Sequence, residues 1–525
     1  MHPRLALVSF KDSTELQERV VEELTRLCAR PPEFWSPRHL SLLACCNHAA
    51  ALGAKAAVIQ RRVQDSDFLA EFNAYYSRQF AHVGQHCVRI HFFREPAPRR
   101  ISVLKYLDRR KVPSSYLGFI TLRPVSQTPV GGSIIGEKSA PEFVRCADEF
   151  PVHLAGVELS VRGTPFMQQD NAVGACAQAA IWMALRTVRK REGTRAHDPA
   201  QITDAATRFS VTSRILPNRA GLTLLQMIEA VRSAGYSPHP ITFGDANFSF
   251  GTTLTGVQLA RAARVLHAYV ESAIPTLLVL YPAGGGHAVV VIGHTFNSDP
   301  IQINDLSLSL SRGVAIKVIH AVSWVPNFII HNDNSGPYLL LDRDTAGGNY
   351  ALDQTFAAIP LLPADVFLTG EEALSFALNL WASVIERTTE QMTFEETAAF
   401  SEQFVIRLLL LDKSKIRRWA ARSDISPEVR RHLRLQDLPR RVWVLELHLK
   451  DHYSKHGQEN AASLVGFILL DSTGDDARSA MLMIFLNLPA FTPHQNGSLI
   501  VASSVKWTAV QTTKCAPVQP FRDLD

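Results

Sequence analysis

Residues 166–186 read Phe166-Met167-Gln168-Gln169-Asp170-Asn171-Ala172-Val173-Gly174-Ala175-Cys176-Ala177-Gln178-Ala179-Ala180-Ile181-Trp182-Met183-Ala184-Leu185-Arg186. Good helix formers dominate from Cys176 onward, whereas the Asp, Asn and Gly before it favour a loop or cap. The pattern predicts a helix with the Cys176 thiol in its first turn. Unpaired backbone N–H groups and the positive end of the helix dipole favour thiolate there. Cys176 is therefore a candidate nucleophile, the alternative being a small buried residue at a helix start.

The loop before this helix contains candidate donors for an oxyanion. Gln169 lies seven positions before Cys176, and Gln168 is its neighbour. A side-chain N–H from either residue, together with the N–H groups of the helix start, would stabilise an oxygen that becomes negative during the reaction.

A histidine follows about a hundred residues later, between two apolar runs. Residues 274–281 and 287–294 are short apolar runs separated by Pro282 and three glycines, and His287 opens the second run. Such runs predict a buried hairpin or two neighbouring strands. His287 would then be held by a rigid strand, with room beside its ring. His294, at the far end, is expected in a loop or at the surface.

The helix-initiating Cys176, with Gln169 before it and Trp182 behind it, and the strand His287 through Gly293 resemble the papain-like cysteine peptidases. Within that superfamily they are most similar to the bacterial double-glycine peptidases. The resemblance covers roughly residues 160–345. Ala177 departs from the pattern, because a Gly commonly follows the nucleophile.

The resemblance implies an α+β fold whose core packs the helix that carries Cys176 on an antiparallel sheet that carries His287. It also implies the roles of the residues. Cys176 attacks the carbonyl, His287 deprotonates the thiol and then protonates the leaving amine, and Gln169 completes the oxyanion hole. No cofactor is needed for this chemistry.

An Asn or Asp on the next strand orients the histidine in that superfamily, and two segments offer one. The stretch 325–338 reads as a strand ending in a polar turn that contains Asp333, which we favour, with residues 297–323 as an insertion. Asn304 or Asp305 lies closer to His287 in the sequence and is the alternative. A turn Asp that satisfies its own backbone is the ordinary structural explanation for either carboxylate.

The length of 525 residues predicts several domains. We expect an N-terminal α+β region at 1–150, the papain-like catalytic domain at 151–360, and a C-terminal helical and β-sheet region at 361–525. In the last region, residues 371–389 and 394–421 carry apolar residues at helical spacing. Three later runs, 442–449, 463–470 and 480–488, alternate like strands of an antiparallel sheet.

Composition is that of a folded globular protein, with 46% hydrophobic residues and 20% charged residues. The seven cysteines form no C-x-x-C pair, which favours a reducing compartment. The chain shows neither a secretory signal nor an apolar segment long enough to span a membrane. We therefore expect a cytoplasmic protein.

The most basic stretch of the chain lies in the C-terminal region, between Lys413 and Arg441. A solvated helix face explains it, and a surface for an acidic protein partner is the sharper interpretation. Nucleic acid is disfavoured, because interleaved stacking aromatics are nearly absent. An earlier basic residue, Arg123, stands before Pro124 at a strand end, where an exposed edge position is expected.

The leading hypothesis is a thiol hydrolase that cleaves a peptide or isopeptide bond of a peptide or protein substrate through a thioester. Two alternatives remain. The same site could transfer the acyl group to an amine, as transglutaminases do. The chain could also be an inactive scaffold or sensor on a peptidase fold.

Overall fold

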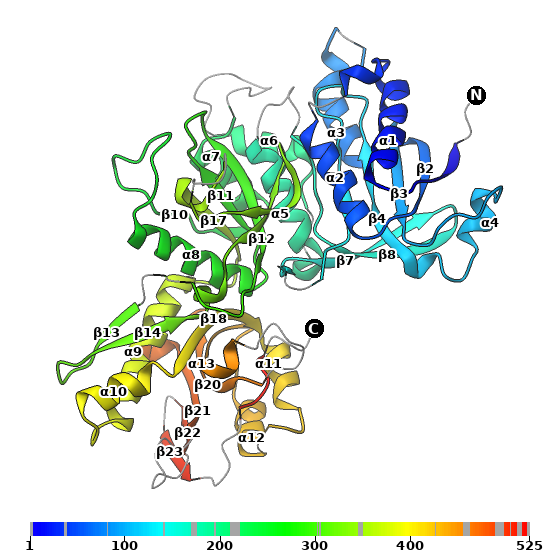
Figure 1. The fold of residues 1–525 in the computed structure, drawn as a ribbon. Coiled ribbons are helices and arrows are strands. Elements are labelled where there is room, and N and C mark those ends of the chain that lie inside the picture. Colours follow the sequence, from blue (N-terminus) through cyan, green and yellow to red (C-terminus); the bar gives the residue numbers. More distant parts are fainter. Residues whose placement is uncertain are drawn as a thin grey trace. The chain divides into compact units, whose positions relative to one another are not determined.

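The computed structural model describes residues 4–35, 39–80, 82–139, 142–169, 176–193, 196–209, 221–301, 303, 306–344, 350–425, 427–454, 462–488, 498–503, 506–511 and 517–521. In these segments the chain is a mixed α+β protein with mostly antiparallel sheets (Figure 1). It divides into two compact units. The first contains residues 1–253, 273–293 and 328–361, and the second contains residues 254–272, 294–327 and 362–525.

The first unit holds fifteen of the described strands and seven of the described helices. Its strands are β1 (Leu5–Ser9), β2 (Ala56–Val63), β3 (Cys87–Phe93), β4 (Tyr116–Leu122), β5 (Ile134–Ile135), β6 (Glu142–Val144), β7 (Asp148–Leu154), β8 (Val157–Gly163), β9 (Tyr236–Pro238), β10 (Ile241–Thr242), β11 (Thr276–Leu280), β12 (His287–Thr295), β15 (Phe328–Asn332), β16 (Gly336–Leu341) and β17 (Thr355–Pro363). Its helices are α1 (Ser13–Cys28), α2 (Leu40–Ala51), α3 (Ser66–Ala74), α4 (Val103–Leu107), α5 (Cys176–Glu192), α6 (Pro199–Thr207) and α7 (Leu224–Ser233).

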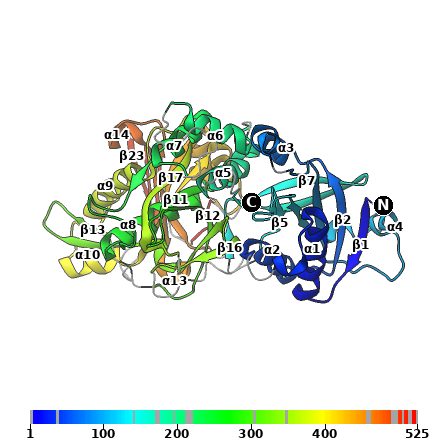
Figure 2. The same ribbon diagram turned by 90° about the horizontal axis from the view of Figure 1, so that it is seen from above.

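Two main sheets organise this unit. One has the strand order β1-β2-β3-β4-β5, and the other runs β10-β17-β11-β12-β15-β16, with β6 beside β12 and β9 beside β17. Strand β12 is buried along its whole length, as its unbroken apolar run requires. Gly293 on β12 permits the close approach of β6, because a Cβ there would lie 2.3 Å from the carbonyl oxygen of Phe143. Figure 2 shows α5, α6 and α7 grouped beside the sheet of β11, β12 and β17.

One hydrophobic core joins the N-terminal segments of this unit to the helix that begins at Cys176. The cluster includes Leu24 of α1, Ile90 of β3, Trp182 of α5 and Val290 of β12, all buried. A single core explains why residues 1–150 and the helix that begins at Cys176 belong to one unit. The sequence, in contrast, predicts a domain boundary at 150/151. The second predicted boundary, at 360/361, lies within one residue of a unit boundary.

The second unit is built on one sheet, of strand order β13-β14-β18-β19-β20-β21-β22-β23. Its strands are β13 (Leu306–Ser309), β14 (Ala315–His320), β18 (Phe404–Asp412), β19 (Arg441–Leu449), β20 (Leu464–Asp471), β21 (Met481–Leu488), β22 (Ser498–Ser503) and β23 (Lys506–Gln511). Its helices are α8 (Gly256–Glu271), α9 (Gly370–Thr388), α10 (Phe394–Ser401), α11 (Lys413–Ala420), α12 (Pro427–Leu435), α13 (Lys450–Tyr453) and α14 (Ala477–Ala480). Helices α8 and α9 both pack on β18.

The prediction of a continuous helical segment at 394–421 was wrong. That segment forms helix α10, strand β18 and helix α11, and β18 pairs with β19 in register over nine residues. Residues 404–411 of β18 are all buried. Because both faces of such a strand are apolar, its sequence lacks the alternation that distinguishes a strand from a buried helix. The three predicted strands that follow are present as β19, β20 and β21.

Arg123 is not at an exposed edge, as the sequence suggested. Its side chain is 1% exposed and forms an ion pair of 2.9 Å with Glu71. The same guanidinium donates to the carbonyl oxygens of Thr128 and Gln168, at 2.9 and 3.0 Å. The pair therefore anchors the backbone of Gln168, the residue that precedes the candidate oxyanion donor Gln169.

We expect Arg123→Ala to destabilise the first unit by about 3–5 kcal/mol, because it leaves the Glu71 carboxylate buried without its guanidinium partner. Urea unfolding followed by tryptophan fluorescence measures this loss. The matched control is Arg208→Ala, which removes an exposed ion pair with Asp204 and should cost about 0–1 kcal/mol. Equal losses for the two variants would contradict the assigned role of Arg123.

Candidate active site

Helix α5 begins at Cys176, as predicted, and its thiol meets the strand that carries His287. The backbone N–H of Ala288, the residue after His287, donates to Cys176 Sγ at 3.3 Å. The N–H groups of Cys176 and Ala177 at the helix start also act to lower the pKa of the thiol. Two segments that are more than a hundred residues apart in the sequence are therefore joined at this sulfur atom.

His287 opens strand β12, and its ring is held on two sides. Its side chain is 5% exposed, and Nε2 lies 3.0 Å from Asn332 Oδ1. Because an amide oxygen only accepts, Nε2 carries the proton, and Nδ1 is left as the basic nitrogen of the neutral ring. Tyr350 packs against the imidazole, with ring centroids 4.6 Å apart.

Asn332 ends strand β15, which lies next to β12 in the sheet. The backbone N–H of Asn334 donates to Asn332 Oδ1 at 3.0 Å. This second bond fixes the amide with its oxygen toward His287. The sequence analysis did not select Asn332. The available signal was its position in the stretch 325–338, one residue before the favoured Asp333.

Asp333, the favoured orienter, is fully buried, and one of its oxygens lies 3.7 Å from His287 Nε2. This distance is longer than a hydrogen bond, so Asn332 and not Asp333 makes the orienting contact. Burial raises the pKa of Asp333 to about 7, although backbone N–H groups of Asp333 and Asn334 act in the opposite direction. The carboxyl group of Asp333, beside the imidazole, therefore gains or loses its proton near neutral pH. The alternatives Asn304 and Asp305 lie outside the described residues.

Gln169 lies at the same end of the sheet. Its side-chain N–H donates to Asn334 Oδ1 at 3.1 Å, so it is tied to the turn that follows Asn332. Gln168 has a structural contact instead, because its side-chain oxygen accepts from the backbone N–H of Val130. Residues 170–175, between Gln169 and Cys176, lie outside the described residues.

Burial favours the neutral forms of both the Cys176 thiol and the His287 imidazole. Burial, with a smaller contribution from the nearby Asp333 carboxylate, raises the pKa of Cys176 to about 11 against the opposing effect of the N–H groups of Ala288, Ala177 and Cys176. Burial also lowers the pKa of His287, while the hydrogen bond to Asn332 opposes this. The resting pair is therefore a thiol and a neutral imidazole, which suits proton transfer at the moment of attack more than a preformed ion pair.

Other predicted features are placed elsewhere in the fold. His294 is not at the surface, because its side chain is 3% exposed. Of the predicted basic stretch, Arg430, Arg431 and Arg434 of α12 line an open groove of about 540 Å³, whereas Arg441 is buried and paired with Asp365. The groove agrees with a surface for an acidic partner, which stays a prediction.

Comparison with protein-family models, with curated proteins and with solved structures finds no match to this chain. None of the helices in the described part of the chain has the length and apolar character needed to cross a membrane.

The charge on Asp333 should control the reactivity of Cys176. We expect Asp333→Asn to lower the pKa of the thiol, because the carboxylate raises it, and so to speed alkylation at pH 8. Iodoacetamide rates for each cysteine across the pH range, read by peptide mapping, measure the effect. Cys28, whose pKa burial raises to about 12, is an internal control and should keep its rate. An unchanged pH profile for Cys176 would show that Asp333 does not act on the thiol.

The same substitution should change the pH dependence of stability. The pKa of Asp333 is raised on folding, so its stabilising contribution is present below the unfolded value of about 4 and is lost as the pH rises through about 7. Asn mimics the protonated form at every pH. We therefore expect Asp333→Asn to stabilise the first unit by up to about 4 kcal/mol at pH 8 and to have little effect at pH 4. Thermal unfolding at the two pH values tests this, and an equal effect at both would contradict it.

Proposed function

We propose that this chain is a papain-like cysteine hydrolase that cleaves a peptide or isopeptide bond through a thioester. The observation that supports it best is that the strand of His287, whose Nε2 is held by Asn332, donates the N–H of Ala288 to the helix-initiating thiol of Cys176. These two contacts support the roles of Cys176 as nucleophile, His287 as base and Asn332 as the group that orients the base in acyl transfer by a thiol.

In the proposed reaction, Nδ1 of His287 takes the proton of Cys176 as the sulfur attacks the carbonyl carbon. The C–S bond forms and the carbonyl oxygen becomes an oxyanion. Collapse of this intermediate expels the amine, which takes the proton from His287, and leaves a thioester on Cys176. Water, deprotonated by the same imidazole, then releases the acid and restores the thiol.

The oxyanion would form beside the N–H groups of Cys176 and Ala177 at the start of α5, which favour negative charge on the sulfur. Gln169 would add a side-chain N–H. This requires its amide to exchange its bond with Asn334 for one to the oxyanion, or to use its second hydrogen. Asn332 keeps Nδ1 unprotonated and oriented.

A second candidate function is a binding scaffold on the same fold. The raised pKa of Cys176 favours it, because a thiol that stays protonated at neutral pH is a poor nucleophile without a functioning base. Transfer to an amine in place of water uses the same site and differs only in the acceptor.

We expect the wild-type protein to cut members of a peptide library and Cys176→Ala to cut none. His287→Ala should lower the cleavage rate by about 10²–10⁴-fold, the typical contribution of a general base. Mass spectrometry of new termini measures cleavage. Addition of a primary amine distinguishes hydrolysis from acyl transfer, because a transferase would place the amine on the product.

Cys28→Ala is the matched control, since it removes another partly buried thiol of the first unit and should retain full activity. An electrophilic peptide probe supplies a readout that does not depend on guessing the substrate. Selective modification of Cys176 that disappears in His287→Ala would support the hydrolase. Modification of Cys176 that is unaffected by His287→Ala would instead favour the scaffold.

A further inference from the structure

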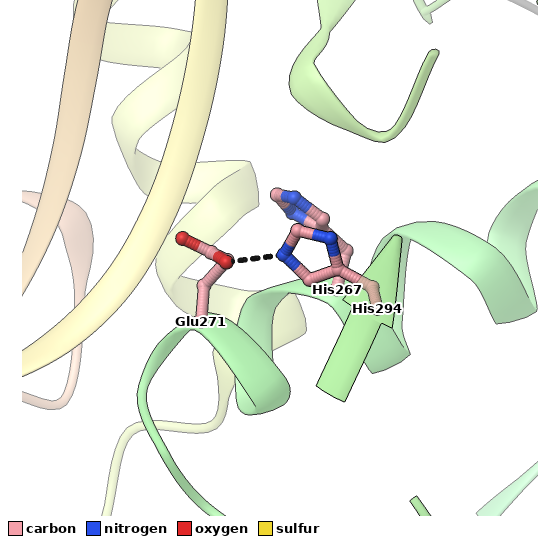
Figure 3. Close-up of side chains that lie close together, drawn as sticks. All are labelled: His267, Glu271 and His294. Carbon is pink, nitrogen blue, oxygen red and sulfur yellow. Dashed lines mark hydrogen bonds and ion pairs between the residues drawn. The ribbon is translucent and has the colours of Figure 1, made fainter. Parts of the chain in front are cut away.

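Three buried side chains of the second unit bring metal-binding atoms together. His267 and Glu271 are four residues apart on helix α8, so they lie on one face of it, and His294 comes from the end of strand β12. One potential ligand atom from each residue lies within 4.8 Å of the other two. Figure 3 shows the carboxylate of Glu271 pointing to the ring of His294, with the ring of His267 directly behind. The side chains of His267, Glu271 and His294 are 1%, 3% and 3% exposed, so all three are buried.

Contacts behind these residues match those that usually support metal ligands. His294 Nδ1 lies 3.0 Å from the carbonyl oxygen of Thr295, so Nδ1 carries a proton and Nε2 faces Glu271. The other oxygen of Glu271 lies 3.3 Å from the guanidinium of Arg407, which Glu446 holds at 2.6 Å. A carbonyl behind a ligand histidine and a cation behind a ligand carboxylate are typical second contacts in metal sites.

The contact between His294 and Glu271 requires a positive charge between the two side chains, either a proton or a metal ion. Nε2 and the carboxylate oxygen are 2.6 Å apart, and the neutral ring would present a lone pair to a negative oxygen at this distance. Either a shared proton or a metal ion removes the repulsion. Two zinc ligands with bonds of 2.0–2.1 Å and tetrahedral angles are about 3.3 Å apart, so an ion requires the pair to open by less than 1 Å.

Two further nitrogens of the same cluster point independently to a bound group. Nδ1 of His267 is buried and has no hydrogen-bond partner within the described ranges. His320, which ends β14, packs edge-on against His267 with ring centroids 5.5 Å apart. Its Nδ1 accepts from the N–H of Val322, so its Nε2 carries a proton, and this buried N–H also has no acceptor among the described residues. Unsatisfied polar atoms of this kind are rare inside proteins.

We propose that His267, Glu271 and His294 bind a divalent transition metal ion, with Zn²⁺ as the best fit to two imidazoles and one carboxylate. Three protein ligands leave a fourth position, and a water molecule there would give the N–H of His320 its missing acceptor. The site goes beyond the proposed hydrolase function and shares no residue with it. It would tie α8 to His294 at the end of the buried strand β12.

The experiment titrates the full-length protein, stripped with a chelator, with Zn²⁺ and with Co²⁺. We expect about one equivalent of either metal per chain, and a visible cobalt spectrum of tetrahedral type without a thiolate charge-transfer band. Glu271→Gln and His267→Phe should each weaken binding at least about 10-fold. Elemental analysis and the cobalt absorption are the readouts.

Two matched variants serve as controls. His452→Ala removes an exposed histidine of the second unit, and Cys176→Ala removes the proposed nucleophile, and both should bind metal as the wild type does. Circular dichroism verifies that each variant is folded. If His267→Phe does not fold, Glu271→Gln, which keeps the shape of the side chain, and the wild-type titration decide the question. Failure of the wild type to bind, a thiolate band, or full binding by Glu271→Gln would overturn the proposal. None of these results bears on the hydrolase.

Discussion

The hydrogen bond from the N–H of Ala288 to Cys176 Sγ is the contact on which the candidate active site depends. It joins the first residue of α5 to the start of β12, so the thiol and the strand that carries His287 meet only in the folded chain. The position of β12 is set by its neighbours. Antiparallel pairing with β11 puts His287 opposite Leu280, so a slip of one residue would move its side chain to the other face of the sheet.

The register of that sheet also buries the candidate site, and this burial determines which of its groups are charged. Every residue of β12 is buried, and burial opposes both a thiolate and an imidazolium. Asn332, a neutral amide, orients His287 without adding charge, whereas Asp333 lies slightly farther from the ring with a pKa raised to about 7. The state of the thiol is thus coupled to one carboxyl that titrates near neutral pH. A substrate that displaces water from the candidate site would therefore meet a thiol and an imidazole that burial has already largely removed from solvent.

The sequence allowed the local parts of this arrangement to be predicted, because they depend on neighbouring residues. The start of a helix at Cys176 and the start of a buried strand at His287 follow from helix propensity, apolar runs and a glycine break, and both are present. The choice between Asn332 and Asp333 could not be made in this way. They are adjacent in the sequence, and only tertiary packing decides which side chain meets a ring 45 residues away. The apolar strand β18 was mistaken for helix for a related reason, since burial on both faces leaves no periodicity to read.

The two buried histidines of β12 illustrate how the partner decides the role of an imidazole. His287 faces an amide oxygen, which fixes one proton on Nε2 and leaves the opposite nitrogen to exchange a proton with a substrate or a thiol. His294 faces a carboxylate that is itself backed by Arg407, and its opposite nitrogen is committed to a backbone carbonyl. Its Nε2 faces that carboxylate oxygen at 2.6 Å, so the pair needs a proton or a metal ion between them. The first environment suits proton transfer and the second suits holding a cation. Because the sequence around both residues is similarly apolar, only the residues brought opposite them by the fold distinguish the two roles.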